Sequence, residues 1–266
     1  MAIKKSELYS TLWRSCDELR GGMDASQYKN YVLTLLFIKY VSDKAKYNVE
    51  SLIEVPEGCS FDDMVNLKGK TNIGEQMNIK LAAWEEANDL DGMFKEADFS
   101  DESKLGKGKD LVQTVSNLIG IFQSSGLNFG RNQASDDDLM GDAYEYLMKH
   151  FATESGKSKG QFYTPAEVSR VMAKVIGLNR ETRPNVSIYD PTCGSASLLL
   201  RALSEASNGA ALYGQEYDIT TVGLAKMNMI LHGYETYDIR SGDTLNNPQF
   251  IKDDNLTTFS YAVANP

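Results

Sequence analysis

The spacing of apolar residues changes along the chain and predicts two different halves. Up to about residue 125, apolar side chains recur every three or four positions, the period of an amphipathic helix. The pattern predicts helices at residues 8–19, 24–41, 73–88 and 111–122. No acid–base pair, metal cluster or phosphate loop stands out in this half. We interpret residues 1–134 as an all-helical domain that serves packing or assembly.

From residue 135 onward, short buried strands alternate with helices, which is typical of a doubly wound α/β sheet. The predicted strands, each with its end, are residues 186–189, 211–216, 237–244 and 261–264. Ser135 with three following aspartates suits the start of a helix, and Thr164-Pro165-Ala166-Glu167 suits the start of another. We expect the second of these helices to pack its apolar residues on the sheet, namely Val168, Val171, Met172, Val175 and Ile176. Residues 135–266 are therefore predicted to form a Rossmann-like domain.

The most informative stretch is the turn at residues 190–197, Asp-Pro-Thr-Cys-Gly-Ser-Ala-Ser, which joins a predicted strand to a predicted helix. Small residues in such a turn let the backbone approach a ligand, and the helix start offers unpaired N–H groups. The turn has one glycine, Gly194, so it does not match the G-x-G-x-x-G sequence that cradles a pyrophosphate. The carboxylate of Asp190 suits a cofactor with a positive end, such as the ammonium of an amino acid.

Further polar residues follow the other strands. Glu216 ends the second strand and lies 26 residues after Asp190, near the spacing at which doubly wound proteins place a carboxylate on a ribose diol. Asp243 follows the third strand, at the edge where ligands bind. Gln161, Phe162 and Tyr163 precede a helix whose start does not explain them. His232 ends a predicted helix, where its charge favours the helix dipole, so we do not expect it to be catalytic.

Composition and charge narrow the class of protein. The chain has 266 residues, with apolar and charged fractions of 42% and 24%, as in globular proteins, and its longest apolar run is too short to span a membrane. Three widely spaced cysteines show neither zinc spacing nor a disulfide framework, which fits a reducing cytoplasm. The net charge of −10 is unfavourable for DNA phosphates. If nucleic acid is the substrate, a partner or further sequence should supply most phosphate contacts.

The motifs, in this order, resemble the amino-methylating adenine DNA methyltransferases, most closely the modification (M) subunit of type I restriction-modification systems. They are Gln161-Phe162-Tyr163-Thr164-Pro165, Asp190-Pro191-Thr192-Cys193-Gly194-Ser195, Glu216, Gly242-Asp243 and Asn265-Pro266. Residues 12–23 and 28–40 also resemble the N-terminal domain of that subunit, so the resemblance covers essentially the whole chain. Ala196 stands where many family members have a second glycine, and it keeps the approach open unless the position requires a positive φ.

The resemblance implies an S-adenosylmethionine site and assigns a part to each motif. Residues Gln161 to Pro165 and Ala166 would border the cofactor, and Asp190 would hold its ammonium side. Its amino-acid part would contact Gly194, Ser195, Ala196 and Ser197. Glu216 would bind the ribose hydroxyls and Asp243 the adenine amine. Asn265 and Pro266 would begin the catalytic Asn-Pro-Pro-aromatic loop that receives a flipped adenine, with no metal.

The family also implies partners: DNA, a specificity (S) subunit that selects the site and a second M subunit, with or without a restriction (R) subunit, and no membrane. The sequence ends before the second proline and the aromatic residue of the catalytic loop. We therefore expect these residues alone to bind the cofactor weakly or not at all, and not to methylate DNA. Two alternatives stay open. One is a nicotinamide oxidoreductase, which the single-glycine turn and the terminal Asn-Pro disfavour, and the other is a non-catalytic assembly module that binds the specificity subunit.

Overall fold

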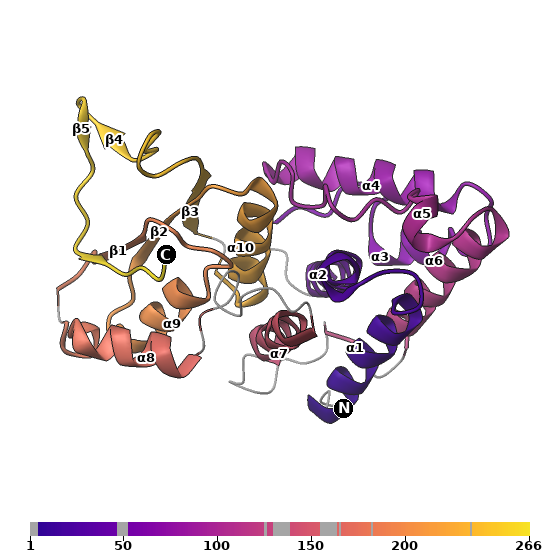
Figure 1. Ribbon diagram of the computed structural model, residues 1–266, viewed down its shortest axis with the longest axis horizontal. Helices are drawn as coiled ribbons and strands as arrows, with labels where there is room; N and C mark the ends of the chain where they lie inside the picture. Colours follow the sequence, from indigo (N-terminus) through magenta and orange to yellow (C-terminus); the bar gives the residue numbers. More distant parts are fainter. Residues whose placement is uncertain are drawn as a thin grey trace. The chain divides into compact units, whose positions relative to one another are not determined.

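The computed structural model describes residues 5–46, 53–124, 127–129, 139–154, 164, 166–181, 183–234 and 236–266. The chain divides into two compact units, Met1–Ser155 and Gly156–Pro266, which are described separately (Figure 1). The domain boundary expected after residue 134 stays a prediction. The helix that follows that point, α7 (Leu139–Glu154), belongs to the first unit. Among the described residues, no helix has the length and apolar character needed to cross a membrane.

The first unit is helical in all its described regular elements, as its apolar spacing predicts. Besides α7 these are α1 (Lys5–Leu19), α2 (Ala25–Ala45), α3 (Phe61–Val65), α4 (Ile73–Asn88), α5 (Glu102–Leu105) and α6 (Lys109–Phe122). Helix α2 has neighbours on several sides, because α1, α3, α6 and α7 all pack on it. Its residues 31–39 are buried without interruption, as expected of a helix with neighbours on several sides.

A buried ion pair lies on this helix. The Nζ atom of Lys39 is 2.7 Å from an oxygen of Asp43, one turn further along α2, and the two side chains are only 10% and 4% exposed. The same carboxylate accepts a hydrogen bond of 3.1 Å from the backbone N–H of Phe129. The charge of Asp43 is thus compensated inside its own unit.

The second unit contains a parallel sheet with the strand order β3-β2-β1-β6. Its elements are α8 (Ala166–Val175), η1 (Leu178–Arg180), β1 (Ser187–Asp190), α9 (Ser197–Glu205), β2 (Ala211–Glu216), α10 (Ile219–Leu231), β3 (Tyr237–Ser241), β4 (Ile251–Lys252), β5 (Asn255–Leu256) and β6 (Tyr261–Ala262). The chain winds outward from β1 to β3 and returns to the other side of β1. This order confirms the predicted doubly wound architecture and leaves a switch point between β1 and β6.

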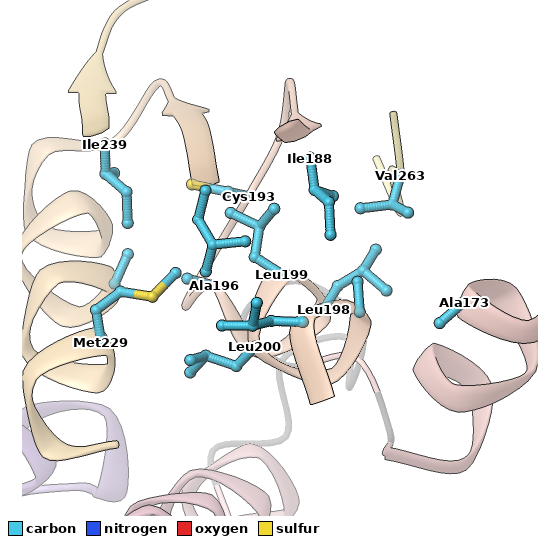
Figure 2. Packing of buried hydrophobic residues seen from close by; sticks show 14 of the residues in the cluster. Ala173, Ile188, Cys193, Ala196, Leu198, Leu199, Leu200, Met229, Ile239 and Val263 are labelled. Atoms are coloured by element: carbon cyan, nitrogen blue, oxygen red, sulfur yellow. The ribbon is translucent and has the colours of Figure 1, made fainter. Parts of the chain in front are cut away.

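One face of the sheet packs against helices. Inward-pointing strand residues such as Ile188 and Ile239 meet the leucines of α9 in one apolar cluster (Figure 2). Gly214 in β2 permits a close approach there, because an added Cβ would lie 2.9 Å from Cys193 Sγ and 3.3 Å from Leu199 Cδ1. The turn after β1 therefore sits directly against β2.

Helix α8 packs differently from the sequence-based expectation, which is wrong on this point. Val168, Val171 and Val175 are exposed by 47%, 61% and 79%. The inward side of the helix carries the buried Ala173, next to the partly buried Met172 and Ile176. The helix lies against α9 and η1 instead of the strands. The sequence offers two neighbouring apolar stripes, and the position of α9 decides which one is buried.

The opposite face of the sheet is covered by the return segment, residues 242–260. Because side chains alternate along a strand, Tyr189 and Tyr213 point away from the helical face. Phe259 stacks on Tyr189 with ring centroids 4.5 Å apart, and Phe250 meets Tyr213 edge-on at 5.7 Å. This aromatic contact holds the return segment on the sheet and leads the chain from the end of β3 to β6.

Candidate active site

A cavity of about 820 Å³ opens where the four parallel strands end. Its lining combines the turn after β1 with Thr164 and with short segments that follow the other three strands. The lining residues selected from the sequence are Thr164, Asp190, Gly194, Ser195, Ser197, Glu216, Asp243, Asn265 and Pro266. The carboxyl ends of parallel strands share one edge of a sheet, which is why residues so far apart in sequence meet here. The volume is typical of a small-molecule site.

Asp190 is the buried charge of this cavity. Asp190 is the last residue of β1 and is 1% exposed. Its Oδ1 accepts a 3.0 Å hydrogen bond from the N–H of Thr192. Burial raises the pKa of Asp190 to about 7, and the nearby charge of Glu216 contributes to the rise. No lysine or arginine occurs among the described residues that line the cavity. The carboxylate is thus available to a cationic ligand.

The turn before α9 holds an unusual backbone conformation. Ala196 is fully buried and has φ 62° and ψ 11°, the left-handed region that a residue with a Cβ enters at a cost. Gly194 is also left-handed, and no atom lies within 4 Å of the point where its Cβ would be. Asn228 of α10 donates a 2.8 Å hydrogen bond to the carbonyl of Ser195. Position 196 therefore does adopt the positive φ for which glycine is the easier residue.

Glu216, at the end of β2, faces the cavity with a fixed carboxylate. Its Oε2 accepts the N–H of Gly194 at 3.0 Å, and its Oε1 accepts the N–H of Asp218 at 3.0 Å. Each oxygen keeps a second lone pair, so the group can still accept two hydroxyl protons. The bond to Gly194 also ties the end of β2 to the turn after β1.

Asp243, just beyond β3, is held as a charged acceptor. Hydrogen bonds from the Asn246 side chain (2.7 Å) and from the N–H groups of Asn246 (3.0 Å) and Leu245 (2.9 Å) lower its pKa. The hydroxyl of Thr244 donates to the carbonyl of Pro191. The loop after β3 is thereby joined to the turn after β1.

Asn265 reaches the cavity from the chain beyond β6. Its Nδ2 donates to Thr164 Oγ1 at 3.2 Å, which orients the amide and leaves its oxygen as an acceptor. Of the expected aromatic motif, Gln161, Phe162, Tyr163 and Pro165 lie outside the described residues. Ala166 begins α8, and its side chain is also outside them.

Among the cavity residues that were not expected from the sequence, two have large, exposed side chains. Tyr217 and Leu245 both line the cavity, and they are 77% and 91% exposed. Each lies within two residues of a cavity carboxylate, Glu216 or Asp243, but an apolar residue at such a position gives no signal of its own in the sequence. Cys193 also lines the cavity, but burial raises its thiol pKa well above the ordinary value, so it is a packing residue against Gly214.

Family models match both halves of the chain. Residues 135–266 match the N-6 DNA methylase family, and residues 8–122 match the HsdM N-terminal domain. The chain belongs to the methylase (M) subunits of type I restriction enzymes. The resemblance of the sequence to this family is thus confirmed.

Individual methylase subunits show the same relationship. The type I restriction enzyme MpnII methylase subunit of Mycoplasma pneumoniae is 29% identical over 96% of this chain and 56% of its own length. The MjaVIII methylase subunit of Methanocaldococcus jannaschii is 31% identical over 93% of this chain and 45% of its own length. The chain thus spans about half the length of these curated relatives.

The fold agrees with a solved methylase subunit as well. The methyltransferase subunit of a type I restriction-modification system from Streptococcus thermophilus has 29% sequence identity and a TM-score of 0.78. That match covers 99% of this chain and 63% of the solved chain. The helical first unit and the parallel sheet of the second are therefore the architecture of the family.

Proposed function

We propose that this methylase-subunit chain binds S-adenosylmethionine in the cavity at the sheet edge and serves methylation of the exocyclic amine of adenine in DNA. One observation carries the proposal: Asp190, Glu216, Asp243 and Asn265, from four separate parts of the second unit, line a single cavity. Each of these residue types matches one chemical group of the reactants.

The charge of the cavity suits this cofactor. Asp190, Glu216 and Asp243 bring three carboxyl groups, and the described lining residues include no basic side chain. S-adenosylmethionine has an ammonium and a sulfonium group against one carboxylate, so it is cationic overall. A nicotinamide dinucleotide has a pyrophosphate, which three carboxylates would repel. The charge distribution therefore favours the methyl donor over the oxidoreductase alternative.

Each part of the cofactor has a matching group in the cavity. The carboxylate of Asp190 would pair with the ammonium, and the turn Gly194–Ser197 would contact the amino-acid part. Glu216 would accept the ribose hydroxyls, and Asp243 would accept a proton of the adenine amine. The side chains of Tyr217 and Leu245 offer apolar contact to the adenine ring. The residues from Gln161 to Ala166 stay predicted neighbours of the cofactor.

The chemistry asks for positioning more than for a strong base. The bound cofactor supplies a methyl group on a sulfonium, which is a good leaving group. The adenine amine is a weak nucleophile because its lone pair is delocalised into the ring. The Asn265 side-chain oxygen and the Pro266 carbonyl would accept hydrogen bonds from its two N–H groups and so favour a pyramidal nitrogen. Thr164 would keep the Asn265 amide in the required orientation, and the base must leave the duplex to reach it.

We further propose that DNA contact and site choice are shared with partners. The net charge of −10 is poorly suited to a chain that grips phosphates alone. A specificity subunit and a second M subunit would supply the remaining surface, with or without a restriction subunit. Copurification of the specificity subunit with the chain, with and without residues 1–130, tests whether the helical unit serves assembly.

Two measurements test the cofactor and the reaction. Titration calorimetry with S-adenosylmethionine at up to millimolar concentration should give binding that the Asp190→Asn variant weakens. In a complex of a specificity subunit with a methylase subunit that carries these residues and the whole catalytic loop, transfer of a labelled methyl group to DNA should yield N6-methyladenine. Binding of a nicotinamide dinucleotide in place of the methyl donor would contradict the proposal. The expectation that the 266-residue chain alone does not methylate DNA stays a prediction, and the same labelling assay tests it.

A further inference from the structure

Gln215 has a buried side chain that does not line the cavity. It belongs to β2, directly before Glu216, and it is 0% exposed. Strand alternation points its side chain away from that of Glu216, toward the face covered by residues 242–260. A buried primary amide needs partners for two N–H groups and one oxygen. Its partners therefore show what it does.

All three partners belong to one loop. The Nε2 atom of Gln215 donates to the carbonyl oxygens of Gly242 and Asn247, both at 3.1 Å, and Oε1 accepts the N–H of Gln249 at 3.0 Å. Residues 242–249 form no helix or strand, and this one side chain makes three of the hydrogen bonds that hold them on β2. The segment, which we call the adenine loop, carries the cavity residues Asp243 and Leu245.

The backbone of Gln215 adds a second connection. Its carbonyl oxygen accepts the N–H of Cys193 at 3.0 Å, in the turn after β1. The neighbouring carbonyl of Glu216 accepts the N–H of Gly242 at 2.9 Å, at the start of the adenine loop. One position of β2 thus sets the turn by its main chain and the loop by its side chain.

We propose that Gln215 is a positioning residue that sets the preference of the cavity for a purine with a 6-amino group. It acts through the adenine loop by fixing the place of Asp243. The inference rests on the proposed function, which gives Asp243 the adenine amine. A hydrogen bond to that amine is directional, so a displaced Asp243 loses it, whereas the carboxylates of Asp190 and Glu216 keep hydrogen bonds of their own to N–H groups outside this loop.

Two variants separate the hydrogen bonds that the Gln215 side chain donates from the one that it accepts. Gln215→Met has a similar length and removes all three side-chain hydrogen bonds. Gln215→Glu keeps the acceptor for the N–H of Gln249 but turns an oxygen toward the carbonyls of Gly242 and Asn247. Gln113→Met is the matched control, because Gln113 is exposed on α6 in the other unit and bonds only to Asn117 among the described contacts of its side chain.

The first test needs no cofactor. In Gln215→Met, hydrogen exchange at the N–H of Gln249 should become at least about tenfold faster, because its buried acceptor is gone. In Gln215→Glu the same N–H should stay protected. Exchange within α10 should be unchanged in both variants and in the control. Unchanged exchange at Gln249 in Gln215→Met would overturn the inference.

The second test compares S-adenosylhomocysteine with S-inosylhomocysteine, in which a carbonyl oxygen replaces the 6-amino group. Gln215→Met should lose about tenfold in affinity for the adenosyl compound and less than about twofold for the inosyl compound. Equal weakening of both ligands, or loss of folding in both Gln215 variants, would mean a purely structural role and overturn the inference. If the unchanged chain binds neither ligand, the proposed function fails as well. If it prefers the adenosyl compound and Gln215→Met keeps that preference, only the inference fails.

Discussion

Among the residues that the structure describes, each unit buries one aspartate almost completely, and the two differ in what surrounds the carboxylate. Asp43 in the helical unit is 3% exposed, and the Nζ of Lys39 lies 2.7 Å away. Asp190 in the sheet unit is 1% exposed, faces a cavity and has no basic residue among the described cavity lining. Burial alone therefore does not separate a carboxylate that is paired in the core from one that faces a cavity. The two differ in whether a described cation lies beside them.

The physical cause of the difference is desolvation. A carboxylate removed from water loses hydration, and a close cation inside the protein offsets that loss. For Asp43 the offset is built into α2, so the pair belongs to the folded core. For Asp190 the described cavity lining includes no lysine or arginine, and burial raises its pKa to about 7. A bound ammonium group would provide the missing charge.

The largest expected effect is on the paired aspartate. Asp43→Asn leaves the Lys39 charge buried without its partner, so we expect the helical unit to lose about 3–5 kcal/mol of unfolding free energy. Urea unfolding followed by tryptophan fluorescence measures this unit selectively, because Trp13 and Trp84 both belong to it. The exposed pair Arg20–Asp17 provides the control, and Asp17→Asn should cost about 1 kcal/mol or less. Equal losses in the two variants would show that the buried ion pair contributes no more to stability than the exposed pair.

The next effect concerns the unpaired aspartate. Asp190→Asn keeps the shape of the side chain and removes its charge, so we expect roughly a 100-fold loss of affinity for S-adenosylmethionine. The folded state should not become less stable, because a desolvated charge is removed. Calorimetry and thermal unfolding measure the two quantities. Asp238→Asn, at an exposed ion pair with Arg240, should leave the affinity unchanged. A less stable Asp190→Asn protein with unchanged affinity would reverse the roles of the two aspartates.

The raised pKa of Asp190 should also make stability and cofactor affinity depend on pH. The pKa of Asp190 is about 7 in the folded chain, whereas an unfolded aspartate has a pKa near 3.9. Between these values the folded state holds a proton that the unfolded state has released, so this group's contribution to stability falls as pH rises through the window. Cofactor affinity should change in the opposite direction, rising about tenfold per pH unit toward pH 7 and then levelling off, because the ammonium pairs with the charged form. Calorimetry from pH 5 to 8 measures this trend, and a flat profile identical to that of Asp190→Asn would contradict it.

A smaller effect concerns the packing beneath the pocket. In Gly214→Ala the new Cβ would lie 2.9 Å from Cys193 Sγ, so we expect a loss of about 1–3 kcal/mol. Adding Cys193→Ala removes that sulfur and should recover part of the loss. Gly74 in the helical unit is the contrast, because its added Cβ would meet the Phe99 backbone oxygen at 2.3 Å and no side-chain change relieves it. Thermal unfolding of the single and double variants measures the coupling, and strict additivity would contradict the contact.

The smallest effect concerns two left-handed residues, one in each unit. Ala196→Gly relieves backbone strain but loses a buried methyl and gains chain entropy on unfolding, so the net change should stay within about 1 kcal/mol of zero. Asp89, the exposed C-cap of α4, has no buried methyl to lose, and Asp89→Gly should stabilise by up to about 1 kcal/mol. Urea unfolding of each variant beside the unchanged chain measures the two changes in unfolding free energy. A gain for Ala196→Gly larger than that for Asp89→Gly would show that strain in the turn exceeds what the burial of its methyl offsets.

Much of the site follows from local sequence, because a strand followed at once by a small-residue turn or a carboxylate encodes its own position in a parallel sheet. Asp190, Glu216 and Asp243 could be selected in this way. Tyr217 and Leu245 could not, because a single apolar residue after a strand gives no sign of whether its side chain is buried or lines a cavity. Their exposed positions at the cavity are visible only in the folded unit.

The two-part architecture, the order of the helices and strands and the candidate carboxylates can be read from the sequence, since they depend on residue periods and on strand ends. Packing through space selects which stripe of α8 is buried, places the Gln215 side chain on residues 242–249, and brings Thr164 to the amide of Asn265. The folded structure also shows that Ala196 is left-handed, that Lys39 pairs with Asp43, and that the described lining around Asp190 includes no lysine or arginine. These properties depend on which side chains come together through space, and in the second unit those side chains are far apart along the chain.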